Sequence, residues 1–258
     1  MPLCICRNVS SEFIHYAYLI LIGFIAGIIN TLAGGGSVLT LPLLIFMGLP
    51  PALANGTNRI GVFIQTVVGV FGFKSKGVDV MPHGLYWGLS ATIGSVIGAF
   101  WAVDIKGETF NTILGFVLLL VVSFTVLNPK TQTHLTERMN GKYFWWSMLA
   151  FFFIGIFGGF IQAGAGYFIL LALTQINQIK LVKSNALKSM IVSVYTLAAL
   201  LVFIYHDQVH WVYGLILAFG QAAGAWVSSR WSAHKEDQVL RILLFIIAVG
   251  MAIKLWFF

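Results

Sequence analysis

Long apolar stretches dominate the chain, and short polar or glycine-rich segments separate them. A helix that spans a membrane needs about 20 mostly apolar residues. Two apolar stretches, 37–49 and 166–176, are too short to span, and each follows a glycine-rich interruption. The pattern predicts an all-α polytopic membrane protein in which two helices are broken. The predicted spans are 13–33, 57–73, 83–103, 108–127, 143–162, 186–205, 208–229 and 238–257.

The positions of Lys and Arg indicate whether each broken helix crosses the membrane or turns back. If 13–49 and 143–176 are hairpins that enter and leave on one side, most basic residues fall on one face, whereas two crossings would divide them almost evenly. Cytoplasmic loops carry an excess of Lys and Arg, so we expect hairpins, periplasmic termini and a cytoplasmic 128–142 loop. The basic face would hold Lys74, Lys76, Lys130, Arg138, Lys142, Lys180, Lys183, Arg230, Lys235 and Arg241, with Lys188 near it, and the other face Arg7, Arg59, Lys106 and Lys254.

The two halves of the chain resemble each other. GFIAGIINTLAGGG (23–36) aligns without a gap with GIFGGFIQAGAGYF (155–168), GTNR (56–59) with NALK (185–188), and GLSATIGSVIGAFW (88–101) with GLILAFGQAAGAWV (214–227). A hairpin plus three spanning helices is an odd number of crossings, so the second half is expected to be inverted. We expect a first transmembrane repeat at 1–128, a cytoplasmic linker at 129–142 and a second repeat at 143–258. Inverted repeats with interrupted helices at corresponding places are typical of secondary transporters.

The glycine-rich breaks are candidate binding sites. Glycine costs a helix about 1 kcal/mol per residue, so the triplet Gly34–Gly36 is expected to break it. Non-helical backbone at membrane depth is tolerated only inside protein or beside water. A helix that restarts after a break presents free N–H groups and a positive dipole end, which suit an anion. The alternative role, close packing of helices, is the one that we expect for Gly94, Gly98, Gly220 and Gly224.

Polar residues near the breaks are further candidates. Arg59 and Lys188 either line a cavity or extend their charged ends to the interface. Asn55, Thr57, Asn58 and Asn185 either cap helices or donate to a ligand. Asn30 and Gln162, which align with each other, either line the pocket or bond helix to helix. The candidate substrate site comprises Asn30, Ala33, Gly34, Gly35, Gly36, Ser37, Thr57, Asn58, Arg59, Gln162, Gly164, Ala165, Gly166, Asn185 and Lys188.

Composition and charge limit the remaining classes of function. The chain is 59% hydrophobic and 9% charged, against about 25% charged in soluble domains, which leaves little for a soluble domain. We assign the net charge of +7 to cytoplasmic loops and not to nucleic-acid binding, because no stretch alternates basic with aromatic residues. Cys4 and Cys6 lack the spacing and partners of a zinc site, so we expect no metal or cofactor. The carboxylates sit at the ends of the predicted segments and not inside them, which weakens a tightly proton-coupled mechanism.

Two motifs carry a resemblance to a known family. G-x-x-A-G-x-I-x-T-L-A-G-G-G-S-x-L-T-L-P, followed by P-P-A-L-A-N-G-T-N-R, resembles the first repeat of the sulfite exporter TauE/SafE family. The second repeat extends the resemblance over nearly the whole chain, although YF replaces further glycines after Gly166 and Pro42 has no counterpart. The resemblance implies a bacterial inner-membrane transporter that exports small sulfur-containing anions, such as sulfite or organosulfonates. The residues themselves indicate only an anion.

We therefore expect export by alternating access around the two breaks. A monovalent anion that leaves a negative cytoplasm gains about 2.3 kcal/mol per 100 mV, so no coupling ion is required in principle. An anion channel, a transporter of another small anion such as a carboxylate, and an accessory subunit stay open as alternatives. An enzyme is not expected, since the chain has no HExxH, GxSxG or paired carboxylates. The expected partners are a small anionic substrate and the lipid bilayer, and a homodimer stays open.

Overall fold

The computed structural model describes residues 9–127 and 136–231, and within these ranges the chain is all-α. Five of the described helices, α1, α4, α6, α8 and α9, are long and apolar enough to span a membrane. This confirms the predicted class of an all-α polytopic membrane protein. The predicted span 238–257 lies outside the described residues. The helices are α1 (Val9–Ala33), α2 (Ser37–Phe46), α3 (Pro51–Lys74), α4 (His83–Asp104), α5 (Gly107–Leu127), α6 (Lys142–Phe160), α7 (Ala165–Gln175), α8 (Leu181–Tyr205) and α9 (Trp211–Trp231).

The two short helices fold back along the helices that precede them. After the turn at Gly34–Gly36, the start of α2 lies on α1, because Gly36 packs directly against the backbone of Ala26. In the second half α7 returns along α6, where the rings of Phe157 and Phe168 meet edge to face with their centroids 5.3 Å apart. Both glycine-rich breaks are therefore the tips of helical hairpins.

Rows of glycine hold two pairs of helices at backbone contact: α4 on α6, and α9 on α1. A side chain at any of these glycines would overlap the neighbouring backbone, so their predicted role in packing is confirmed. Small residues have this role in many membrane proteins. The two pairs repeat each other: Gly94 and Gly98 lie on the backbone of Phe152 and Ile156, and Gly220 and Gly224 on that of Ile20 and Phe24.

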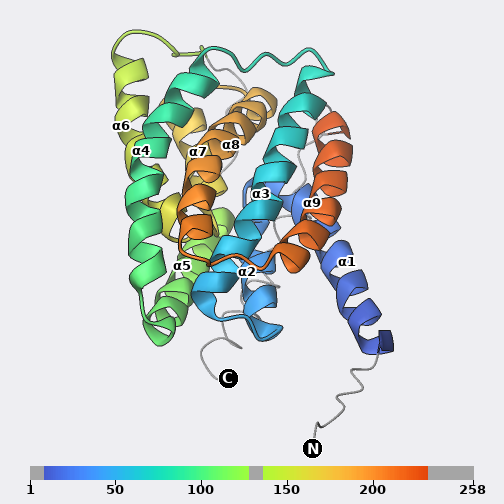
Figure 1. Ribbon diagram of the computed structural model, residues 1–258. Coiled ribbons are helices and arrows are strands. Elements are labelled where there is room, and N and C mark those ends of the chain that lie inside the picture. Colours follow the sequence, from blue (N-terminus) through green and yellow to red (C-terminus); the bar gives the residue numbers. More distant parts are fainter. Residues whose placement is uncertain (1–8, 128–135, 232–258) are drawn as a thin grey trace, which may run out of the picture.

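The long helices form two groups that run in opposite directions. Figure 1 shows α4 and α6 on one side of the molecule, α1 and α9 on the other, and α3 and α8 between them. The helices α3 and α8 are antiparallel, because Gly56 at the start of α3 lies against Phe203 near the end of α8, whereas Gly69 faces Ser189. Since α3 runs with α9 and α1, and α8 with α4 and α6, the helices α1, α3 and α4 are antiparallel to α6, α8 and α9, respectively.

Two helices begin earlier than the sequence indicated, which changes the role of their polar residues. The helix α3 begins at Pro51 and α8 at Leu181, not at 57 and 186. Proline is favoured at the first position of a helix, because the N–H at that position has no acceptor within the helix and its absence costs nothing. The capping alternative is therefore wrong for Asn55, Thr57, Asn58 and Asn185, which are buried inside these helices.

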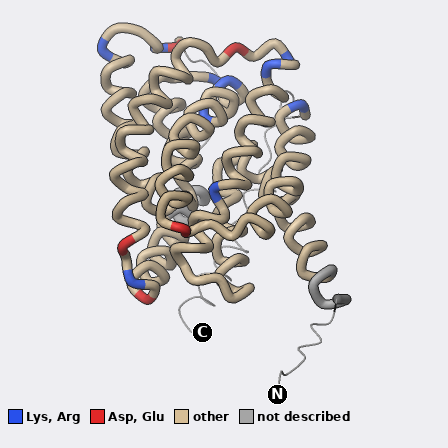
Figure 2. The backbone as a smooth tube through the Cα atoms, in the orientation of Figure 1, with Lys and Arg blue, Asp and Glu red and all other residues tan. Residues whose placement is uncertain are grey.

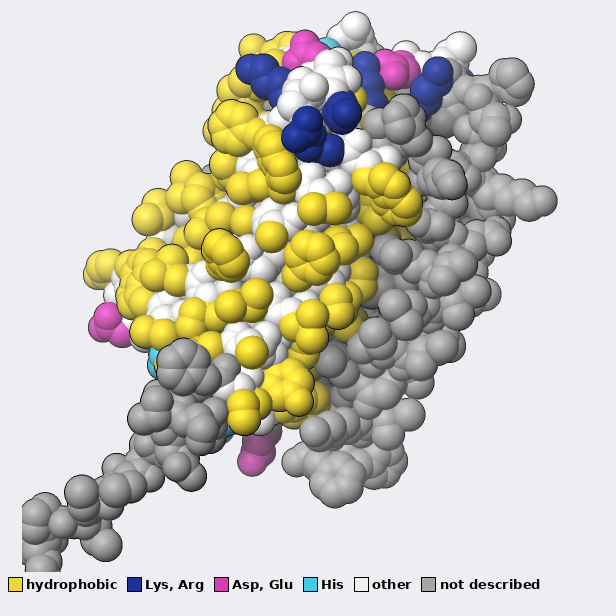
Figure 3. All heavy atoms as spheres, turned by 90° about the vertical axis from the view of Figure 1, so that its right-hand side faces the viewer, with side chains coloured by type: hydrophobic (Ala, Val, Ile, Leu, Met, Phe, Trp, Pro, Cys, Tyr) yellow, Lys and Arg dark blue, Asp and Glu magenta, His cyan; other side chains and the backbone are white. Residues whose placement is uncertain are grey.

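The surface is divided between one basic end and apolar sides. The described members of the predicted basic set gather at the end where α3 and α9 finish and α4, α6 and α8 begin (Figure 2). The sides expose large apolar residues such as Trp146, Phe153 and Phe219, and Figure 3 shows a face of this kind below the basic end. The basic set described here is Lys74, Lys76, Arg138, Lys142, Lys180, Lys183 and Arg230.

The glycine contacts predict a selective loss of stability. In Gly155→Ala the new Cβ would overlap the backbone of Ala91, which cannot move aside as a side chain could. We expect a loss of about 1–3 kcal/mol, as for other overpacked sites, although alanine is otherwise the better helix former. Thermal unfolding in detergent, followed by tryptophan fluorescence, measures it. The control is Gly107→Ala, whose Cβ would make only an ordinary contact with Pro51 at 3.5 Å; equal melting temperatures for both variants would contradict the prediction.

Candidate functional site

The two hairpin tips meet inside the protein. A Cβ on Gly34 would overlap the carbonyl group of Gly166, and one on Gly166 would lie 2.9 Å from the Cα of Gly34. The chain turns through left-handed backbone in both breaks, with φ +79° at Gly34 and +82° at Gly164, a conformation that glycine adopts without strain. Residues 34–37 and 161–166 are all buried. The two glycine-rich breaks are thus buried and in direct contact.

Several backbone N–H groups at the tips have no acceptor among the described residues. The helices α2 and α7 begin at Ser37 and Ala165, and their first turns carry the positive ends of two helix dipoles. Backbone N–H groups that are buried are nearly always paired, with protein, water or a ligand. The arrangement therefore suits an anion. The unpaired N–H groups belong to Gly35, Gly36, Ser37, Ala163, Gly164 and Gly166.

Lys188 of α8 closes the C-terminal end of α1. Its Nζ donates to the carbonyl oxygens of Asn30 at 2.7 Å and Thr31 at 2.8 Å, and to Oδ1 of Asn185 at 2.9 Å. The side chain is only 2% exposed. A cation at this position stabilises the helix, because the last carbonyl groups have no partner within the helix and carry the negative end of its dipole.

Arg59 of α3 closes the C-terminal end of α6 in the same way. Its Nη1 donates to the carbonyl oxygen of Gly158 and to Oε1 of Gln162, both at 3.2 Å, and its Nη2 donates to the carbonyl oxygen of Gly159. The guanidinium lies 4.6 Å from the ring centroid of Phe203. Because Arg59 and Lys188 are buried, the alternative that they extend to the interface is wrong.

The contacts of the two cations are similar but not in register. The alignment pairs Ser95 with Gln221; in the structure Ser95 bonds to Tyr195 of α8, and Gln221 contacts Gly61 of α3. Packing therefore pairs Tyr195 with Gly61. In this register Lys188 corresponds to Ala54 of α3 and not to Arg59, a difference of five residues or about 1.4 helical turns.

Asn55 is the residue that follows the position of Lys188 in this register. Like Arg59, it bonds to the broken helix of the other half. Its Nδ2 donates to the carbonyl oxygen of Phe160, the last residue of α6, at 2.8 Å. The first half thus uses both Asn55 and Arg59 for the closure that Lys188, held by Asn185, makes alone in the second half. Each broken helix is closed by side chains from the opposite half.

Of the other predicted residues, Asn58 and Asn30 lie at the first tip, and Thr57 does not. Asn58 lies at the first tip, where its Oδ1 accepts a hydrogen bond of 2.6 Å from Thr40 of α2. Asn30 precedes this tip, and its side-chain amide has no partner among the described residues. Thr57 is not brought to the tips, because its hydroxyl donates to the carbonyl oxygen of Leu53 and accepts from the N–H of His210.

Gln162 bonds helix to helix, which was one of its two predicted roles. Its Nε2 donates to the hydroxyl of Tyr195 at 3.2 Å and to that of Thr196 at 3.3 Å, while its Oε1 accepts from Arg59. The sequence analysis missed Tyr195, Thr196 and Thr40. The sequence shows each of them as a polar group inside an apolar stretch. Thr40 follows the first break, and Tyr195 and Thr196 lie about two helical turns after Lys188.

The described part of the site has an excess of positive charge. Every Asp and Glu whose side chain is described, namely those at 79, 104, 108, 137 and 207, is exposed at a helix end or in a loop. Arg59 and Lys188 therefore have no buried carboxylate as a partner within that part of the chain. Two buried cations and two helix N-termini together favour an anion.

The closure of α1 by Lys188 predicts a local effect of its loss. Lys188→Met would leave the carbonyl oxygens of Asn30 and Thr31 buried without their donor, at a cost of about 1–3 kcal/mol. We expect a lower melting temperature and faster amide hydrogen exchange over residues 29–35. Lys183→Met is the control, since Lys183 forms a 2.7 Å ion pair with Glu137 at the surface and such pairs contribute little. Exchange at 29–35 as slow as in the wild type would refute the assigned role.

Comparison with known proteins gives the family. The model of the sulfite exporter TauE/SafE family matches residues 19–255. The probable membrane transporter protein ORF9 of Sinorhizobium sp is 27% identical over 239 residues, covering 93% of this chain and 91% of the relative. The probable membrane transporter protein YfcA of Escherichia coli K12 is 28% identical over 239 residues, covering 92% and 88%. No solved structure matches. The chain is a multi-pass membrane protein that belongs to the sulfite exporter TauE/SafE family.

Proposed function

We propose that this protein exports a small sulfur-containing anion, sulfite or an organosulfonate, across a bacterial inner membrane. The observation that carries the proposal is the meeting of two helix N-termini whose N–H groups have no acceptor among the described residues. Each tip is connected to a buried cation through one shared group. At the first tip, the carbonyl oxygen of Asn30 accepts from both the N–H of Gly34 and Lys188. At the second tip, Arg59 bonds to the side chain of Gln162. The sulfur chemistry comes from the description of the family.

Alternating access is the mechanism that the burial of the tips supports. A channel open to both sides would expose the residues that line it to water, whereas residues 34–37 and 161–166 are all buried. Helices at corresponding places in the two halves run in opposite directions. We infer that the halves are inverted repeats, whose approximate symmetry gives the inward-facing and outward-facing states similar energies.

The basic end is proposed to face the cytoplasm and the start of α1 the periplasm. The C-terminus lies outside the described residues, and the predicted span 238–257 would bring it to the periplasm as well. Lys and Arg are enriched in cytoplasmic loops, and seven described basic residues gather at this end. A monovalent anion moving outward then follows the membrane potential. At 100 mV this supports a concentration ratio of about 50 without a coupling ion.

Transport by purified protein in liposomes tests the proposal. We expect saturable, potential-driven flux of sulfite and methanesulfonate, and counterflow when one of them is present on both sides. Lys183→Met, altered only at the surface, should retain this flux. Transport of acetate but neither sulfur anion would overturn the substrate class, and flux that neither saturates nor shows counterflow would indicate a channel.

A further inference from the structure

The two tips carry different side chains, although their backbones are alike. We propose that the anion is held on the first tip alone, and that Asn58 of α3 is the side chain that selects it. This inference rests on the proposed transport of a small anion and adds which half of the molecule binds it. Three observations support it: the position of Asn58, its unpaired donor, and the apolar residues at the equivalent places of the second half.

The position of Asn58 is fixed by Thr40. The Thr40 hydroxyl donates to Oδ1 of Asn58 at 2.6 Å, and the Thr40 N–H bonds to the carbonyl oxygen of Gly36 at 3.4 Å. Thr40 therefore belongs to the first turn of α2. The bond holds the amide of Asn58 beside the turn that carries the unpaired N–H groups of the first tip.

The Nδ2 of Asn58 has no partner among the described residues, although Asn58 is 0% exposed. Buried side-chain donors are rarely left unpaired in native proteins, and one beside a helix N-terminus points to a ligand. The neighbouring unpaired groups are also donors: the N–H groups of Gly35, Gly36 and Ser37. These four unpaired donors suit a deprotonated oxyanion, which accepts several hydrogen bonds and donates none.

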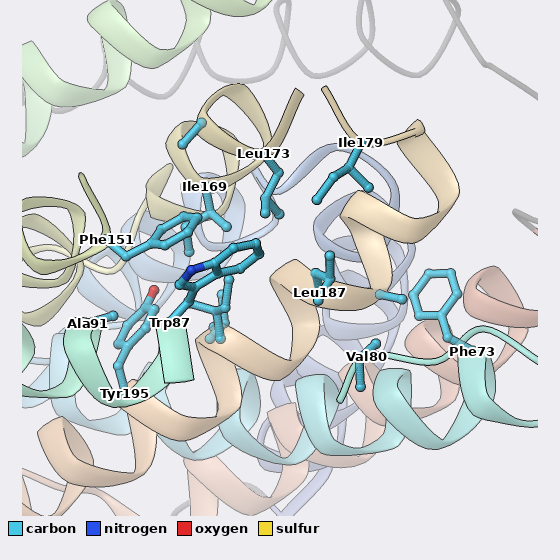
Figure 4. Close-up of a cluster of buried hydrophobic side chains, with 14 of the residues drawn as sticks. Phe73, Val80, Trp87, Ala91, Phe151, Ile169, Leu173, Ile179, Leu187 and Tyr195 are labelled. Carbon is cyan, nitrogen blue, oxygen red and sulfur yellow. The ribbon is translucent and has the colours of Figure 1, made fainter. Parts of the chain in front are cut away.

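The second tip has no such side chain. The alignment pairs Thr40 with Ala172 and Asn58 with Leu187, and the packing register moves the partner of Asn58 to Val192. All three are apolar and belong to one buried cluster, in which Figure 4 shows Leu187 among the side chains around Trp87. The one amide at the second tip, that of Gln162, already bonds to Arg59, Tyr195 and Thr196. The Nε of Arg59 also lacks a partner, but among the side-chain amides at the tips a free donor lies only at the first tip.

Two substitutions of Asn58 separate its donor from its shape. Asn58→Asp keeps the size of the side chain and an acceptor for Thr40 but replaces the donor with negative charge, so sulfite should bind at least about 100-fold more weakly. Asn58→Leu removes the donor without adding charge and should weaken binding by about 10-fold to 100-fold. Asn111→Asp is the matched control: Asn111 lies near the start of α5 and its Oδ1 has no partner, so sulfite affinity should not change. Calorimetric titration of each purified protein with sulfite measures these effects.

A measurement on the wild type keeps the inference testable if the variants do not fold. We expect sulfite to slow amide hydrogen exchange in residues 34–40 and to leave residues 163–168 nearly unchanged. Equal protection of both tips, or wild-type affinity in Asn58→Leu, would overturn the assignment to the first tip while the proposed transport stands. If the wild type binds neither sulfite nor methanesulfonate, the proposed function fails, and this inference fails with it.

Discussion

The closure of each broken helix by a cation from the opposite half is the interaction on which the site depends. A break at membrane depth creates a helix C-terminus whose carbonyl groups have no partner in the helix and no water to bond. Lys188 satisfies those of α1 and Arg59 those of α6. Without such closure the breaks would have to lie in bulk water, and the tips could not meet inside the protein.

The same closure decides the sign of the ligand. Each break has a negative end, where one helix stops, and a positive end, where the next begins. The cations are bonded to the two negative ends, so they compensate these and leave the N-termini of α2 and α7 without a counter-charge. The described carboxylates are all exposed and remote from the tips. The field at the junction of the tips is therefore positive, and an anion is the charge that it accommodates.

Sequence patterns predicted the helices, the two breaks and the glycine packing, because each of these follows from local chemistry. Three glycines in a row break a helix wherever they occur, and glycine at i, i+4 spacing permits close approach wherever two helices meet. The start of α3 differs from the prediction because the polar stretch LANGTNR favours a later start, whereas Pro51 begins the helix.

The roles of the basic residues could not be predicted in this way. Whether Arg59 bonds to a ligand, to water or to α6 depends on a contact between residues 59 and 158–162, which no local pattern encodes. Thr40 and Tyr195 were missed for the same reason. Each has an ordinary place in an apolar helix and gains its role only from a partner on another helix, Asn58 for Thr40 and Gln162 for Tyr195.

Helix packing also limits how alternating access can proceed. Rocking of the two sequence halves against each other would separate α4 from α6 and α1 from α9, whose backbones touch through glycine. A motion of α1, α3 and α9 against α4, α6 and α8 leaves both of these contacts intact. The bonds that it must rearrange include those of Arg59, from α3 to α6, and of Lys188, from α8 to α1. Arg59 and Lys188, which leave the tips positive, therefore also link the two groups of helices. An anion bound at the tips lies beside these links, where it can shift the equilibrium between the two relative positions of the groups.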